Sequence, residues 1–207
     1  MKNKIYIVVL ASIFLIGCNP TKTTNACNNG ASVLGDSSDF DEAIPFEDAP
    51  AISQEQIDKY LKAINEARFH SRYCGSKKFN ATTKLEWSNK LYTAAYEHSQ
   101  DMGKNCSISH SGSGKESDWT AKVHSLNHPS KVDERVKNSG FKNGYIGENV
   151  AAGYKNLDEV MKGWLNSPGH CENIMNPNYK YVGMALYYNS RDSKQYHYYW
   201  TQNFGGK

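Results

Sequence analysis

The sequence predicts one α+β domain, and three observations lead to this prediction. Apolar residues recur at helical spacing in the segments that follow residue 52. Two runs rich in aromatic and β-branched residues come late, at 179–188 and 195–204. About 155 residues follow position 52, which is the size of one domain with a full hydrophobic core. We therefore expect helices that flank a small antiparallel sheet.

Two long helices are predicted first. One starts at Ser53, whose hydroxyl can cap it, with Gln56 completing a capping box, and it ends before Tyr73. Its apolar stripe contains Ile57, Leu61, Ile64 and Ala67. The other runs from about residue 88 to residue 103. Its apolar face contains Leu91, Ala95, His98 and Met102.

Two further helices are predicted farther along the chain. A short one spans about 131–138. Another starts after Asn156, a residue type that caps helices, and buries Trp164. Pro168 and Gly169 are expected to end it, since both residue types interrupt helices.

The strands lie mostly at the end of the chain. The runs 179–188 and 195–204 are expected to pair as an antiparallel hairpin. The segment 189–194 between them is polar and lacks glycine, so it suits a loop longer than two residues. Residues 146–152 form a third candidate strand.

The N-terminus has the pattern of an export signal. Lys2 and Lys4 precede an apolar run of 12 residues, 5–16, which is too short to span a bilayer. The run ends at Leu-Ile-Gly-Cys, the pattern of a bacterial lipoprotein signal. We therefore expect 1–17 to be a signal peptide and Cys18 to become the lipidated N-terminus. The alternative is an ordinary secretory signal that is cut nearby. Both readings place the domain outside the cytoplasm.

Residues 18–51 are expected to form an acidic, flexible tether, and residues 52–207 the domain. The tether is rich in Asn, Thr, Ser, Asp and Ala, and it carries six acidic residues against one basic residue, Lys22. The domain keeps 21 basic and 15 acidic residues, a net charge of about +6. It has no basic stripe and no nucleic-acid-binding motif, so we expect no nucleic-acid partner.

The cysteine count suits an exported protein. Without Cys18, four of the five cysteines remain: Cys27, Cys74, Cys106 and Cys171. An even number in an exported chain favours disulfides, and four cysteines allow three connectivities. The chain contains no Cys-x-x-Cys, which makes a zinc cluster the weaker reading.

Three short segments carry candidate chemistry. Residues 106–111 read Cys-Ser-Ile-Ser-His-Ser, residues 147–153 read Gly-Glu-Asn-Val-Ala-Ala-Gly, and residues 167–170 read Ser-Pro-Gly-His. Each places one imidazole or one carboxylate beside small residues that favour turns. The functional groups are those of His110, Glu148 and His170. Two histidines and a glutamate that meet in a cleft suit metal binding or acid/base chemistry.

In this order, with Trp164 before the third segment and an aromatic-rich end at 199–205, these segments resemble the CAP superfamily, and in particular its bacterial branch. The superfamily is also called SCP/TAPS and includes cysteine-rich secretory proteins, antigen 5 and pathogenesis-related 1 proteins. The resemblance covers about 52–205. It implies a three-layer α-β-α sandwich with a cavity lined by His110, Glu148 and His170.

The same resemblance implies a Cys74–Cys171 disulfide, which leaves Cys27 and Cys106 either paired or free. One departure matters for chemistry. Plant and animal members carry a second glutamate three residues after the tryptophan, where this chain has Ser167. The missing carboxylate argues against glycoside hydrolysis by paired carboxylates. It leaves a weak, open Zn²⁺ site that water completes, with Glu148 as a ligand or as the group that orients an imidazole.

The remaining histidines are not expected to belong to the site. His98 shares the apolar stripe of its helix, so we expect it to be partly buried. His124 and His128 are spaced as a helical pair, but their loop is unsuited to a rigid ligand set. His70 and His197 have no supporting context. Asn149 is expected to hold loop backbone through its amide.

Three functional hypotheses follow. The first is a lipid-anchored domain of the cell envelope that binds a lipid, sterol or cell-wall ligand through the histidine cavity. The second is a metal-assisted hydrolase of envelope glycan or peptide. The third is a structural or adhesive module with a vestigial cavity. The sequence has no Gly-x-Ser-x-Gly, no His-Glu-x-x-His and no phosphate loop, so no nucleophile or zinc-protease motif supports the second.

Overall fold

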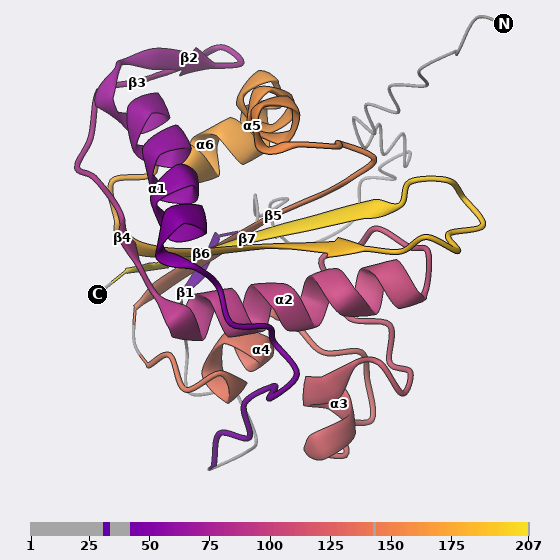
Figure 1. Ribbon diagram of the computed structural model, residues 1–207. Helices are drawn as coiled ribbons and strands as arrows, with labels where there is room; N and C mark the ends of the chain where they lie inside the picture. The colour runs from indigo at the N-terminus through magenta and orange to yellow at the C-terminus, as the bar shows by residue number, and fades with distance from the viewer. Residues whose placement is uncertain (1–30, 34–41, 143, 207) are drawn as a thin grey trace, which may run out of the picture.

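The computed structural model of the chain describes residues 31–33, 42–142 and 144–206 (Figure 1). The predicted signal peptide, Cys18 and Cys27 lie outside these residues. A five-stranded sheet has the order β1 (Ala31–Val33), β5 (Tyr145–Ala152), β7 (Tyr198–Gly206), β6 (Tyr179–Tyr188) and β4 (Glu86–Trp87). Adjacent strands in this sheet are antiparallel, except that the two-residue edge strand β4 runs parallel to β6.

Helices cover both faces of this sheet (Figure 1). One layer holds α1 (Gln54–Phe69), α5 (Leu157–Asn166) and α6 (Pro168–Met175). The other holds α2 (Asn89–Lys104), α3 (Trp119–Val123) and α4 (Val132–Asn138). A small separate hairpin, β2 (Arg72–Cys74) with β3 (Lys77–Phe79), follows α1. The predicted α+β class with a three-layer α-β-α sandwich is confirmed.

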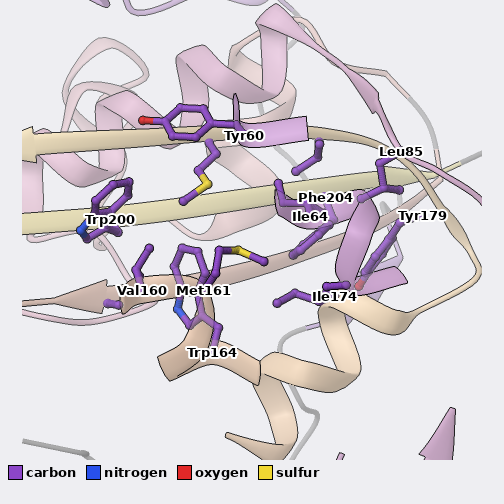
Figure 2. Close-up of a cluster of buried hydrophobic side chains, with 14 residues drawn as sticks. Tyr60, Ile64, Leu85, Val160, Met161, Trp164, Ile174, Tyr179, Trp200 and Phe204 are labelled. Atoms are coloured by element: carbon purple, nitrogen blue, oxygen red, sulfur yellow. The ribbon is translucent and has the colours of Figure 1, made fainter. Parts of the chain in front are cut away.

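The main hydrophobic core lies between the sheet and the layer of α1, α5 and α6 (Figure 2). Ile64 of α1, Val160 of α5 and Phe204 of β7 have no exposed surface there. Trp164 is 1% exposed and donates its indole N–H to the Val150 carbonyl at 3.2 Å. Burial of such side chains supplies most of the stabilisation, roughly 1.5–3 kcal/mol for each.

The predicted helix starts are found in the structure. The Ser53 hydroxyl accepts the Gln56 N–H at 3.2 Å, and the Asn156 side chain caps α5 by accepting the Glu159 N–H at 3.0 Å.

A second layer of core joins α2 to the sheet. There α2 crosses β6 at Gly183, where a Cβ atom would collide with the backbone of α2.

The helix that was predicted to end at Pro168 and Gly169 does end just before them, but a further helix that the sequence analysis did not predict begins there. Helix α5 ends at Asn166, but Pro168 is the first residue of α6. Proline is favoured at that position because its missing N–H would have no helical partner there, and its fixed φ already suits a helix. His170 therefore lies in the first turn of a helix rather than in a loop.

The predicted β6–β7 hairpin is confirmed, with a longer loop than expected. Strand β7 begins at Tyr198, not at residue 195, because Gln195 and His197 have φ of 62° and 60°. Such left-handed backbone cannot continue an extended strand. Asp192 organises the loop by accepting hydrogen bonds from the His197 N–H at 2.8 Å and the Tyr199 hydroxyl at 2.7 Å.

Contacts with the domain begin before the expected boundary at residue 52. Phe46 is 7% exposed and its ring packs against those of Tyr96 and Trp119. The Trp119 indole N–H also donates to the Ile44 carbonyl at 2.8 Å. Among the described residues, no helix is long and apolar enough to cross a membrane.

Candidate functional site

Two buried carboxylates fix the loop that carries His110. Asp101, near the end of α2, accepts the Ser113 N–H at 2.7 Å and the Ser117 hydroxyl at 2.5 Å. Asp118 accepts the backbone N–H groups of Gly114 and Ser130 at 2.9 and 3.0 Å. The loop is polar in sequence, but these bonds hold its backbone in place.

Glu148 lies on β5 with a fully buried side chain, and both of its oxygens are hydrogen-bonded. Oε1 accepts from Nδ1 of His110 at 2.9 Å. Oε2 accepts from Nη2 of Arg135 at 2.9 Å and, with the amide of Asn203 oriented to satisfy both of its neighbours, from that amide at 3.1 Å. An ionised carboxylate only accepts, so the His110 proton is assigned to Nδ1. The Nε2 lone pair of His110 is then available, and this side chain is 51% exposed.

Arg135 on α4 joins the glutamate to the histidine loop. It is 1% exposed, and Nη2 also donates to the His110 carbonyl at 2.9 Å. Nη1 donates to the carbonyl and the hydroxyl of Ser130. Sequence reasoning missed this residue, because nothing in a seven-residue helix marks one arginine as the partner of a buried carboxylate.

The ionisation of Glu148 is set by opposing effects. Burial raises its pKa, but Arg135, His98 and His110 together outweigh burial and hold the pKa at about 2. Glu148 is therefore a carboxylate at neutral pH. The buried charge is compensated rather than isolated, as such groups must be.

His98 is fully buried, not partly buried as expected, and it lies beside the site. Its Nε2 is 2.7 Å from the Ser109 carbonyl, so Nε2 carries the proton. The same atom lies 3.8 Å from Glu148 Oε1. Burial lowers the pKa of His98, and the nearby Arg135 lowers it further. A neutral His98 thus supports the loop that carries His110 through its bond to the Ser109 carbonyl.

The backbone of His170 is held against β5. Asn149 donates to the His170 carbonyl at 3.2 Å and to Gln202 Oε1 at 3.0 Å, which fits its expected role in holding backbone. Asn173 of α6 in turn donates to the Glu148 carbonyl at 3.1 Å. Burial, with a smaller contribution from the nearby His110, lowers the pKa of His170 to about 4. The two imidazoles are therefore within electrostatic reach of each other.

The structure contains the Cys74–Cys171 disulfide that the family resemblance implied, with a Cα–Cα distance of 5.4 Å. It ties the β2–β3 hairpin to the residue that follows His170. Within the described residues Cys106 forms no disulfide. Its relation to Cys27 stays open, because Cys27 lies outside them.

The donor set fits a metal ion only in a limited way. In the part of the chain that the structure describes, no three His, Cys, Asp or Glu side chains are placed to hold one ion together. Because both Glu148 oxygens are already engaged, the available donors are the imidazoles of His110 and His170. This arrangement matches a role for Glu148 in orienting His110. It leaves two protein ligands for a metal ion, and water would fill the other coordination positions.

Other features lie apart from the three residues. His124 bonds to Asn138 at 2.8 Å and His128 contacts the Pro129 carbonyl at 2.9 Å, so each has its own partner. Two hollows of about 530 and 330 Å³ are lined by other residues, the first beside Lys90 and the second beside Tyr60. Neither contains His110, Glu148 or His170.

Comparison with known proteins gives relatives in bacteria. The uncharacterized protein YkwD of Bacillus subtilis is 40% identical over 74 residues, 36% of this chain and 26% of that protein. The uncharacterized membrane protein YlbC of the same species is 31% identical over 121 residues, 58% of this chain and 28% of that protein. The matched part is thus about a quarter of the length of each of these relatives.

Two solved structures share the fold. An outer surface protein from Borrelia burgdorferi has a TM-score of 0.55 at 19% identity, over 76% of this chain and 96% of the other. An extracellular protein containing an SCP domain from Bacillus anthracis has a TM-score of 0.51 at 20% identity, over 76% and 45%. At these identities the likeness shows the fold alone.

The model of the CAP family, described as the cysteine-rich secretory protein family, matches residues 61–204. That range holds the whole His110, Glu148 and His170 arrangement and most of the sandwich around it. The chain belongs to the cysteine-rich secretory protein (CAP) family.

Proposed function

We propose that this CAP domain is held on the extracytoplasmic side of a bacterial membrane and binds an envelope or environmental ligand at His110 and His170. The N-terminal pattern that ends at Cys18 supports a lipid anchor at that residue. The names of similar proteins agree with this location: one is an outer surface protein, one is extracellular and one is a membrane protein.

One observation carries the proposal: the buried, ionised Glu148 accepts a hydrogen bond from the Nδ1–H of His110 at 2.9 Å. This bond fixes the tautomer and the ring plane, and it directs the unprotonated Nε2 outward. Histidines that bind metal ions commonly donate their other N–H to a carboxylate in this way. The orienting group is itself fixed, since Arg135 bonds to both Glu148 and the His110 carbonyl.

We further propose that a divalent ion such as Zn²⁺ joins the two imidazoles. His170 remains neutral at physiological pH because burial lowers its pKa to about 4, and a neutral imidazole is the form that binds metal. With two protein ligands the site is open to water and weaker than a structural zinc site. A bound ion would supply a Lewis-acidic contact for an anionic or carbonyl group of the ligand.

Calorimetric titration of Zn²⁺ into the purified full chain tests this proposal. His110→Ala and His170→Ala should each remove most of the affinity. Glu148→Gln should weaken binding about tenfold, as expected for a group that orients a ligand. His70→Ala is the matched control, because His70 is exposed at the end of α1 and should leave affinity unchanged.

If the double His110→Ala/His170→Ala variant binds zinc as well as the parent chain, the surface is not a metal site and metal-free binding becomes the better reading. The hydrogen-bonded His110–Glu148 pair is also the arrangement of an oriented general base. The same variants should therefore be assayed on cell-wall fragments. Turnover by the parent that disappears in His110→Ala would favour the hydrolase, and neither zinc binding nor turnover would favour the adhesive module.

A further inference from the structure

Two aromatic side chains stand in solvent at one corner of the molecule. Phe69, the last residue of α1, is 74% exposed, and Tyr73 on β2 is 66% exposed. They are the two most exposed large hydrophobic residues among those that the structure describes. Figure 1 shows the β2–β3 hairpin projecting beside the end of α1, away from the main sheet. We call residues 69–79 the hairpin tip.

The pairing of the two short strands explains why Tyr73 faces outward. Tyr73 lies opposite Lys78, and both are exposed. The alternate pair, Cys74 opposite Lys77, faces α6, where Cys74 is bonded to Cys171 and Lys77 contacts Glu172 at 3.1 Å. Because side chains alternate along a strand, one face of the hairpin is fixed on α6 and the other is left to solvent.

The tip is also basic. Residues 69–79 contain three basic residues, Arg72, Lys77 and Lys78, and no acidic one. Arg68 is buried and donates to backbone carbonyls, and Lys77 is paired with Glu172. Arg72 and Lys78 are the remaining basic residues of the tip, and Lys78 is exposed.

We propose that the hairpin tip docks this domain on the surface of an anionic lipid bilayer. Aromatic side chains favour the boundary between headgroups and acyl chains, and basic residues beside them are attracted to anionic lipids. Exposed rings within a basic segment match this surface, whereas a soluble anionic polymer would recognise only the charge. The inference stands on the tip alone and does not require the histidine site.

Docking at the tip would orient the rest of the domain. The disulfide holds β2 against α6, and Gly75 at the turn sits so close to Pro168 that a Cβ would lie 3.1 Å from its ring. His170 follows Pro168 by two residues in α6. A bilayer under the tip therefore lies on the same side of the fold as the helix that presents His170.

Fluorescence quenching by brominated lipid tests the contact in the full chain. Tyr73→Trp adds a reporter at the tip, and Tyr188→Trp adds one at a second exposed site, 54% exposed, at the end of β6. Each chain is placed in vesicles of equal parts brominated phosphatidylcholine and phosphatidylglycerol, and the signal of the parent chain is subtracted. We expect the added signal at position 73 to be quenched at least about twofold more than that at position 188.

Charge reversal supplies the second arm. Lys78→Glu in the Tyr73→Trp chain should remove the extra quenching, and so should high salt or vesicles of phosphatidylcholine alone. Lys78 lies opposite Tyr73, on the face of the hairpin away from Cys74 and Lys77, so this variant leaves the Lys77–Glu172 ion pair in place. Equal quenching at positions 73 and 188, or no effect of Lys78→Glu, would overturn the proposal. A response of the reporter to soluble polyphosphate but not to vesicles would replace the membrane with an anionic polymer.

Discussion

Arg135→Met is the most informative single change, because it removes the cation from a buried ion pair and keeps an unbranched apolar side chain in its place. Arg135 is 1% exposed and the Glu148 side chain is fully buried, so solvent cannot replace the lost partner. Removing one member of such a pair costs about 3–5 kcal/mol of unfolding free energy. The variant would also lose the bond that holds the His110 carbonyl.

The pH dependence of stability offers a second measurement of the same ion pair. The pKa of Glu148 is about 2 in the folded chain, against an ordinary value of 4.5. This difference corresponds to roughly 3 kcal/mol, which is present above pH 4.5 and is lost as pH falls towards 2. Among the interactions that lower this pKa, Arg135 is the largest. In Arg135→Met the pKa should rise, so the variant and the parent should converge in stability as pH falls below 4.5.

Urea unfolding followed by circular dichroism at neutral pH and along an acid series measures both effects. Lys122→Met is the matched control, because Lys122 pairs with Glu116 at the surface and such pairs contribute at most about 1 kcal/mol. Adding Glu148→Gln to Arg135→Met should recover part of the loss, since no buried charge then remains unpaired. The account of the site would be refuted if Arg135→Met lost no more unfolding free energy than the control. It would also be refuted if the parent and the variant lost the same stability as pH falls below 4.5.

Three further outcomes are expected. In an NMR titration, the His170 ring should stay neutral down to about pH 4, because burial disfavours its cation; a midpoint near 6.5 would contradict this. Replacing both Cys74 and Cys171 with alanine should lower the unfolding free energy by about 4–5 kcal/mol, since the bond spans 97 residues, and an unchanged urea midpoint would count against it. Gly183→Ala should lower the unfolding free energy by about 3 kcal/mol because the added methyl meets the backbone of α2. Gly169→Ala should not lower the unfolding free energy in this way, because open space surrounds that position. Equal losses in the two variants would contradict the packing argument.

Much of the fold follows from local physics that a sequence displays directly. The hydroxyl of Ser53 and the amide of Asn156 cap helices in the structure because a cap needs only its next few residues. The aromatic runs at the end of the chain pair as strands for the same kind of reason. His110, Glu148 and His170 were found through their small, turn-forming neighbours and through a family resemblance that also implied the disulfide.

The tertiary structure alone decided what Glu148 does. Its partner Arg135 comes from a different element, and no spacing rule links a short helix to a strand on the sheet beside it. A buried charge must be compensated, but the compensating group can come from anywhere in the chain. The same holds for His98, whose helical face predicted contact with the core but not with Ser109 and Glu148. The start of a second helix at Pro168 was missed because proline both ends and begins helices, and only packing against β5 through Asn149 and Asn173 selects the second outcome.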